Sequence, residues 1–171
     1  MKLSKKILIS FTLGLCINPA FADQNFFNAT EISAKKGDMT AQYNLGVMYA
    51  NGQGVTQNYS KAFEWYSRAA AQGDADAQYR LGLMYASGQG VTQNYSKAFE
   101  WYSKAAAQGD ALGQNRLGVM YANGQGVAQN YSKAIEWYGK AAAQGQADAQ
   151  HKLAVMYANG QGVSQNYTKA I

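Results

Sequence analysis

The chain has 171 residues, with 15 basic and 10 acidic side chains and a formal net charge of +5. The first 22 residues contain three of the lysines and no carboxylate, so the other 171 − 22 = 149 residues carry about (15 − 3) − 10 = +2. This low charge gives no indication of a nucleic-acid partner. The same segment contains the only cysteine, Cys16, so the rest of the chain can form neither a disulfide nor a thiolate metal site.

The N-terminal segment has the pattern of a secretory signal peptide. Lys2, Lys5 and Lys6 precede the apolar run Ile7–Ile17, and Ala20-Phe21-Ala22 is a small-x-small cleavage site. The apolar run has about 11 residues, against the roughly 20 that a membrane-spanning helix needs, so a cleaved signal is favoured over an uncleaved anchor. We predict cleavage after residue 22, a periplasmic or secreted protein, and no stable membrane insertion once residues 1–22 are removed.

Residues 23–37 contain the apolar side chains Phe26, Phe27, Ala29 and Ile32 before a Lys-Lys-Gly end. This pattern matches a degenerate copy of the second helix of the repeat that follows. We expect the segment to form a half-repeat that caps the N-terminal end of a repeat array.

The rest of the chain repeats with a period of 36 residues. The repeat is marked by Leu45-Gly46, Leu81-Gly82, Leu117-Gly118 and Leu153-Ala154, and residues 56–67 recur unchanged as residues 92–103. The repeats span 38–73, 74–109, 110–145 and 146–171. Ile171 aligns with Phe63 inside the second helix of the repeat, so we expect the fourth repeat to be truncated. A period of this length is typical of helical hairpins that bury their apolar faces by stacking.

Each complete repeat predicts two helices joined by a glycine-rich loop. In the first repeat, apolar residues at i, i+4, i+7 and i+8 predict a helix over 38–50, which the glycines in 51–54 end. A second apolar stripe predicts a helix that starts after Asn58, a good N-cap, and ends at Gly73. Short loops make the two helices antiparallel neighbours. The predicted fold is therefore all-α, a solenoid of stacked antiparallel hairpins.

Two kinds of residue are predicted to bring the helices close together. Glycine in the middle of a helix costs roughly 1 kcal/mol relative to alanine, so we interpret the mid-helix glycines as points where another helix crosses. These are Gly46, Gly82 and Gly118. Each complete repeat also has a tryptophan that lies off the stripe facing its own first helix, and we expect it to pack against the neighbouring repeat. These are Trp65, Trp101 and Trp137.

The pattern A-x-x-x-L-G-x-x-Y-x-x-G-x-G-V-x-x-N-Y-x-K-A-x-x-W-Y-x-x-A-A-x-Q-G resembles the Sel1-like repeat, a longer relative of the tetratricopeptide repeat, and covers residues 38–171. The resemblance implies a right-handed α/α superhelix whose first helices line a concave face. It also implies a role as an adaptor or scaffold for other proteins. Some secreted relatives carry a cysteine pair in each repeat, and this sequence departs from that branch.

By resemblance to tetratricopeptide grooves, the concave face is expected to hold a protein or peptide segment. The candidate groove residues are Tyr43, Tyr79, Asn115 and His151 at one position, Val47, Leu83, Val119 and Val155 at the next, and Asn51, Ser87, Asn123 and Asn159 at the third. Four first helices at a spacing of roughly 8–10 Å give about 30 Å, which is room for around nine extended residues. Arg80, Arg116 and Lys152 lie beside these positions, either favouring an acidic partner or forming solubilising surface.

Signals for catalysis are few. His151 is the only histidine, so no multi-histidine metal site is predicted, and no cofactor is predicted either. Ser33 and Lys36 match the S-x-x-K element of penicillin-recognising enzymes, without its S-D-N and K-T-G partners. The favoured function is a non-enzymatic interaction scaffold. The alternatives are a β-lactamase-like or other cell-wall hydrolase, and a secreted effector that engages host proteins.

Overall fold

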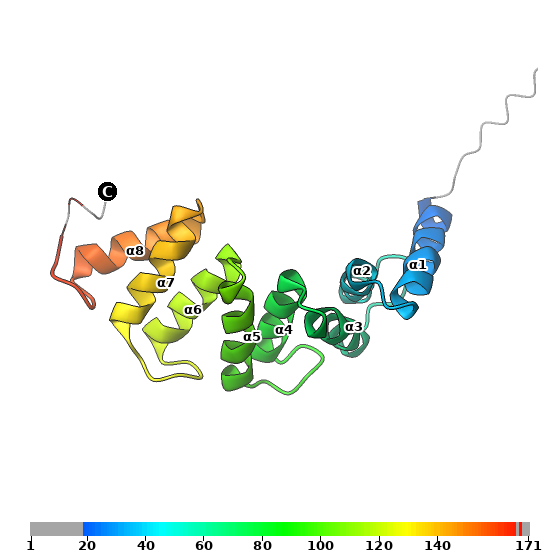
Figure 1. Ribbon diagram of the computed structural model, residues 1–171, viewed down its shortest axis with the longest axis horizontal. Coiled ribbons are helices and arrows are strands. Elements are labelled where there is room, and N and C mark those ends of the chain that lie inside the picture. The colour runs from blue at the N-terminus through cyan, green and yellow to red at the C-terminus, as the bar shows by residue number, and fades with distance from the viewer. Residues whose placement is uncertain (1–18, 167, 169–171) are drawn as a thin grey trace, which may run out of the picture.

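The computed structural model describes residues 19–166 and 168, which form eight α-helices and no strand. The signal segment up to residue 18 and part of the end of the fourth repeat lie outside the described residues. The helices are α1 (Pro19–Lys35), α2 (Met39–Asn51), α3 (Tyr59–Ala71), α4 (Ala75–Ser87), α5 (Tyr95–Ala107), α6 (Ala111–Asn123), α7 (Tyr131–Ala143) and α8 (Ala147–Asn159). Each helix packs against the next, and Figure 1 shows them following one another along an arc. The predicted all-α solenoid is confirmed.

None of the helices in the described part of the chain is both long and apolar enough to cross a membrane.

Helix ends are fixed by the polar and glycine residues that the sequence indicates. The Asn58 side chain accepts a hydrogen bond from the Lys61 backbone N–H at 2.9 Å, which caps α3, and α5 and α7 have the same cap. Gly52 ends α2 with a φ of 72°, in the left-handed region, and its N–H donates to the Met48 carbonyl. The first helix of this repeat therefore lies one residue further along the chain than the predicted 38–50.

The mid-helix glycines lie where the two helices of a hairpin cross. A Cβ atom on Gly46 would lie 2.6 Å from Cδ1 of Tyr66, and one on Gly118 would lie 2.5 Å from Cδ1 of Tyr138. Both tyrosines are buried, so their rings have little room to move away. Glycine is needed because any side chain at this position overlaps the ring. The predicted crossing points are confirmed, and the crossing partner is the second helix of the same repeat.

A chain of glutamine amides links each repeat to the next. The Gln78 side chain donates to the Ala70 carbonyl at 3.3 Å and accepts from Gln108 at 2.9 Å, and Gln108 also donates to the Gly73 carbonyl at 2.9 Å. The pairs Gln42–Gln72 and Gln114–Gln144 make the same contacts. Gln78 is only 6 % exposed, and a buried amide stabilises a protein when its partners are present. These bonds therefore set the register of the stacked repeats.

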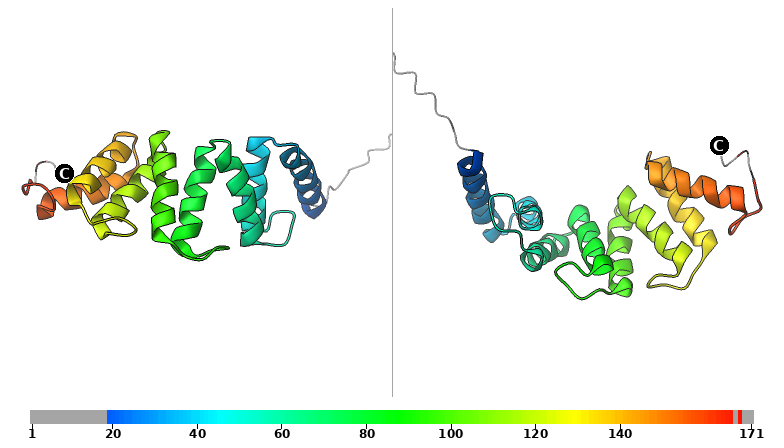
Figure 2. Two further views of the ribbon diagram at one scale, coloured as in Figure 1. Left: turned by 60° about the horizontal axis from the view of Figure 1, so that its bottom comes forward. Right: turned by 180° about the vertical axis from the view of Figure 1, so that it is seen from behind.

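The two glycines of each Gly-x-Gly loop have different roles. The first ends a helix, whereas the second contacts the preceding repeat. A Cβ atom on Gly90 would lie 2.5 Å from the carbonyl oxygen of Tyr59, and Gly126 approaches Tyr95 in the same way. Figure 2 shows the loops of the three complete hairpins along one edge of the solenoid. In the second, third and fourth repeats, the second glycine therefore brings the loop against the start of the second helix of the repeat before it.

The tryptophans lie where repeats meet. Trp137 packs against a cluster that combines Ala98 and Tyr102 of the preceding repeat with Leu117 and Met120 of its own. The cluster that it packs against therefore combines residues of both repeats, whereas the sequence predicted packing against the neighbour. A cation one turn further along covers each tryptophan ring, at 3.9 to 4.4 Å from the ring centroid.

Helix α1 takes the place of a second helix before the first repeat. Phe27 packs edge-on against Tyr49 with 5.6 Å between ring centroids, as Phe63 packs against Tyr85 at 5.5 Å. This equivalence supports the predicted capping half-repeat. The helix begins at residue 19, so it runs through the bond after residue 22 at which cleavage is predicted.

Candidate partner-binding surface

Three hollows lie in a row along the first helices. Their volumes from the N-terminal to the C-terminal end are about 180, 210 and 420 Å³. Leu83 lines both the first and the second hollow, and Val119 lines both the second and the third. The hollows therefore adjoin, and we call them together the inner row.

Seven of the predicted groove residues line the inner row. They are Asn51, Leu83, Ser87, Val119, Asn123, His151 and Val155. His151 is exposed and Val155 is 40 % exposed, so both are open to solvent in the third hollow. Helical periodicity brought these positions together correctly, because residues four apart share a face of a helix.

The tyrosines predicted to face the groove instead connect helices. The Tyr43 ring lies against Tyr66 and the Tyr79 ring against Tyr102, both with 5.8 Å between centroids. Val47 is half-buried and packs against the core cluster of the first repeats. None of these predicted residues lines the inner row.

The cations beside the predicted groove have a role in stacking as well as lining the hollows. The Arg80 guanidinium pairs with the hydroxyl of Tyr43 in the preceding repeat, and Arg116 pairs with Tyr79 in the same way. Arg80 lines the first hollow and Arg116 the second. The sequence left two roles open for these cations, attraction of an acidic partner or a solubilising surface. The structure adds a third role, a contact between neighbouring repeats.

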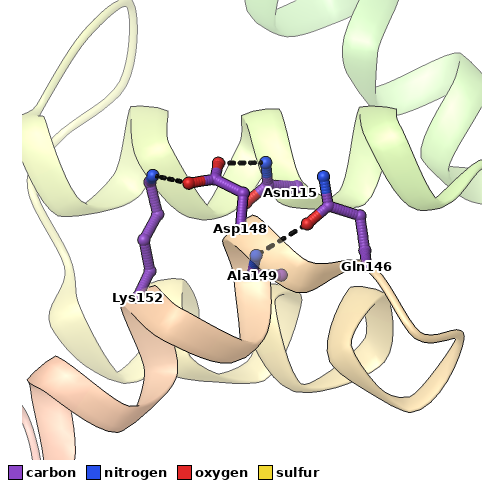
Figure 3. A network of polar contacts seen from close by, with 5 residues as sticks. All are labelled: Asn115, Gln146, Asp148, Ala149 and Lys152. Atoms are coloured by element: carbon purple, nitrogen blue, oxygen red, sulfur yellow. Dashed lines mark hydrogen bonds and ion pairs between the residues drawn. The ribbon is translucent and has the colours of Figure 1, made fainter.

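An amide and a carboxylate replace this tyrosine–cation pair at the junction of repeats three and four. Asn115, which is 3 % exposed, donates from Nδ2 to Oδ2 of Asp148 at 2.8 Å, and the Lys152 ammonium pairs with Oδ1 of the same carboxylate (Figure 3). Lys152, and to a smaller extent Asn115, lower the pKa of Asp148 below its ordinary value. Oδ1 of Asn115 has no hydrogen-bond partner in the described structure. Burial places Asn115 in the junction, away from the predicted groove surface.

The sequence reasoning missed a tyrosine at the start of each second helix. Tyr59, Tyr95 and Tyr131 line the three hollows in turn. The oxygen of Tyr59 accepts a hydrogen bond from Gln57 at 3.1 Å, and the other two tyrosines accept the same bond at 3.1 and 3.2 Å. Because the oxygen accepts there, the hydroxyl hydrogen can still be donated to a further acceptor. The identity of this polar aromatic residue in every repeat was the available signal.

A second set of tyrosines forms the inner wall of the hollows. They are Tyr66, Tyr102 and Tyr138, the residues that contact the mid-helix glycines. Burial raises the pKa of Tyr66 to about 12 and raises the pKa of the other two above the ordinary value as well. These hydroxyls therefore stay protonated and neutral at physiological pH.

The other sequence candidates lie away from the inner row. Ser33 is half-buried near the end of α1 and Lys36 is exposed in the turn that follows, and neither lines any of the three hollows. Asn159 is the exposed last residue of α8 and also lies outside them. Among the residues that the structure describes, no group of three or more His, Cys, Asp or Glu side chains could hold a metal ion.

Stacked helical hairpins with a repeated row of small hollows define an α-solenoid of the scaffold type. The model of the Sel1 repeat matches residues 40–74, 75–110, 111–146 and 147–171. The chain belongs to the Sel1 repeat family, whose members generally act as protein–protein interaction scaffolds.

Solved structures of related proteins share the fold. The chain is 39 % identical to a protective antigen of uropathogenic Escherichia coli with an SLR fold, with a TM-score of 0.81 over 84 % of this chain and 32 % of that one. It is 34 % identical to a Sel1 repeat protein from Oxalobacter formigenes, with a TM-score of 0.82 over 88 % and 61 %. Cysteine-rich protein B of Helicobacter pylori is 25 % identical, with a TM-score of 0.60 over 76 % and 93 %.

The chain thus spans about a third of the length of the Escherichia coli protein and about three fifths of the Oxalobacter protein. None of the curated proteins compared with the chain matches it.

Proposed function

We propose that this protein is an exported scaffold that binds an extended segment of a partner protein along the inner row. The observation that carries the proposal is the continuity of the three hollows through Leu83 and Val119. A segment that occupies one hollow continues directly into the next. Each repeat then adds a similar set of contacts, as stacked repeats do when they present one extended surface.

The composition of the inner row suits a peptide backbone. Leu83, Val119 and Val155 supply apolar surface, while Ser87 and Asn123 supply polar side chains at its rim. A peptide offers both an apolar side-chain surface and unpaired backbone N–H and C=O groups, so it requires both kinds of contact. The proposal is therefore a binding function.

Export is supported by the basic head, the apolar run and the small-residue cleavage pattern of residues 1–22. Mass spectrometry of the protein from the envelope fraction should give an N-terminus at Asp23. A product that keeps Met1 and stays in the cytoplasm would contradict the export proposal.

Affinity capture tests the binding surface. The triple variant Asn51→Ala, Ser87→Ala and Asn123→Ala removes one exposed polar side chain from each hollow. We expect the captured partner to bind at least tenfold more weakly, because three lost hydrogen bonds at roughly 0.5–1.5 kcal/mol each contribute roughly 1.5–4.5 kcal/mol together. Helix content and melting temperature should stay nearly unchanged.

The matched control removes three exposed hydroxyls from the second helices, one for each repeat. These changes are Ser60→Ala, Ser96→Ala and Ser132→Ala. The control should bind the partner as the unchanged protein does. Equal capture by both triple variants would show that the partner binds elsewhere.

A further inference from the structure

We infer that the partner segment is acidic, with a carboxylate side chain at about every third residue, one for each hollow. This inference rests on the proposed function, because it specifies the segment that the inner row would bind.

The charges around the hollows are of one sign. Each hollow has one cationic side chain in its lining, which is Arg80 in the first, Arg116 in the second and Lys152 in the third. No aspartate or glutamate lines any of the three. Complementary charge across an interface favours the matching partner and disfavours the wrong one, so the inner row selects an anionic segment.

The tyrosine hydroxyls add hydrogen-bond donors beside these cations. Tyr59, Tyr95 and Tyr131 each accept a glutamine N–H and keep their own hydrogen for another acceptor. A carboxylate has two oxygens and accepts several hydrogen bonds at once. Each hollow thus offers a positive charge and a hydroxyl donor, the combination that a carboxylate side chain uses.

The three hollows are not equally positive. Asp148 pairs with Lys152 and so offsets part of the charge at the third hollow, where His151 is the only other titratable base in the lining. Arg116 also interacts with the Asp148 carboxylate, whereas Arg80 interacts with tyrosines and with no carboxylate. The first hollow is therefore expected to hold its carboxylate more tightly than the second and third.

The spacing of the repeats sets the spacing of the carboxylates. The spacing of roughly 8–10 Å expected between neighbouring first helices corresponds to about three residues of an extended chain, at ~3.3 Å for each residue. The sequence pattern of the segment is then acid-x-x-acid-x-x-acid. Side chains three residues apart point in the same direction when the segment adopts a polyproline II conformation, which has three residues per turn and a rise of about 3.1 Å per residue.

Other occupants of the inner row lack this chemistry. Residues 1–22 of the chain contain three lysines and no carboxylate, so they do not complement the cations. A second copy would offer Glu64, Glu100 and Glu136, but these lie on rigid helices 36 residues apart and do not form an extended acidic strand.

Synthetic peptides test the inference directly. Three labelled nine-residue peptides of serine and alanine would carry glutamates at positions 1, 4 and 7, three consecutive glutamates, or glutamines at positions 1, 4 and 7. Fluorescence anisotropy should show that the spaced glutamate peptide binds about tenfold more tightly than the glutamine peptide and more tightly than the clustered one. Its affinity should fall as salt is raised, because salt screens exposed charges.

Substitutions at Arg116 connect the binding to the hollow. Arg116→Asn introduces the residue that Asn44 supplies at the same position of the first repeat, and Arg116→Lys introduces the residue that Lys152 supplies in the fourth. We expect Arg116→Asn to weaken the spaced glutamate peptide about fivefold and leave the glutamine peptide unchanged. Arg116→Lys should keep most of the affinity. The control Lys36→Asn removes the same charge outside the hollows and should have no effect.

The outcomes separate this inference from the proposed function. Equal binding of the glutamate and glutamine peptides, or of the spaced and clustered peptides, would overturn the inference and leave the scaffold function standing. The inference also fails if Arg116→Asn binds as the unchanged protein does, if a single-stranded oligonucleotide competes more strongly than the peptide, or if no peptide binds. The proposed function is contradicted only if the captured partner binds the triple variant of the inner row as tightly as it binds the unchanged protein.

Discussion

Different side chains join the repeats at the two ends of the array. The first junction lies between repeats one and two, and the last lies between repeats three and four. In the former, the Tyr43 ring packs on Tyr66 and its hydroxyl pairs with Arg80. In the latter, Asn115 stands in place of the tyrosine and pairs with Asp148, which pairs in turn with Lys152. The adjoining hollow is about 180 Å³ at the first junction and about 420 Å³ at the last.

The backbone does not change with these side chains. All four first helices have 13 residues and end at a glycine with φ between 67° and 77°. The helix crossings therefore hold each hairpin together and the glutamine contacts join neighbouring repeats, while the residues along the inner row differ between repeats. This division allows a repeat array to change what it binds while it keeps its shape.

The helix crossings should be equally sensitive in different repeats. Gly46→Ala and Gly118→Ala should each lower the free energy of unfolding by about 2 kcal/mol, because the new Cβ overlaps a buried tyrosine ring. Gly139→Ala is the control, since its Cβ in α7 meets no atom within 4 Å, and it should raise stability by about 0.5–1 kcal/mol. Urea unfolding measures all three. A stabilising Gly118→Ala would show that the crossing tolerates alanine.

Removal of a buried glutamine should lower the free energy of unfolding slightly less than the glycine substitutions do. Gln78→Ala removes one of the hydrogen bonds of the Ala70 carbonyl and one of those of the Gln108 amide, and we expect a loss of about 1–2 kcal/mol. Gln150→Ala removes the equivalent but exposed side chain, which makes one such bond to Ala142, and should lose less than half as much. Thermal unfolding of the two variants compares them. Equal losses of stability in the two variants would show that burial of the amide does not increase its contribution to stability.

The side chains of the first junction should also fit at the last junction. The double variant Asn115→Tyr and Lys152→Arg rebuilds the Tyr43–Arg80 pair and removes the unpartnered Oδ1 of Asn115. We expect a gain of about 1 kcal/mol from the aromatic contact and from the loss of a buried unsatisfied acceptor. The reverse change, Tyr79→Asn with Arg116→Lys, should destabilise by a similar amount. A loss in both directions would show that each junction depends on its wider surroundings.

The smallest expected effect is the acid response of the last junction. The pKa of Asp148 is lowered in the folded state, so its contribution to stability is present above the ordinary value of about 3.9 and is lost as the pH falls through the lowered pKa. The pair is largely exposed, so the contribution should be no more than about 0.5 kcal/mol. Asp148→Asn should lose that contribution at neutral pH and approach the stability of the unchanged protein in acid. Urea titrations of both proteins at neutral and at acid pH measure their difference in stability. A difference that does not change with pH would contradict the lowered pKa of Asp148.

The sequence predicted the architecture closely because a period of 36 residues repeats each packing signal. The caps at Asn58 and Gly52 and the crossing at Gly46 could all be inferred from local chemistry. The direction in which Tyr43 points could not be inferred, because helical periodicity places a residue on a face of its helix but does not indicate which neighbouring helix covers that face. Tyr59 was missed because its place in the apolar stripe of the second helix indicated a core residue, although it lines a hollow.

The most direct test of the account is photo-cross-linking from single positions on the folded protein to its captured partner. A photoreactive side chain at Ser87, on the rim of the second hollow, should cross-link to one acidic stretch of the partner. The same side chain at Glu100, exposed on the neighbouring second helix, should give no product. Cross-links from Glu100 and none from Ser87 would contradict binding along the inner row.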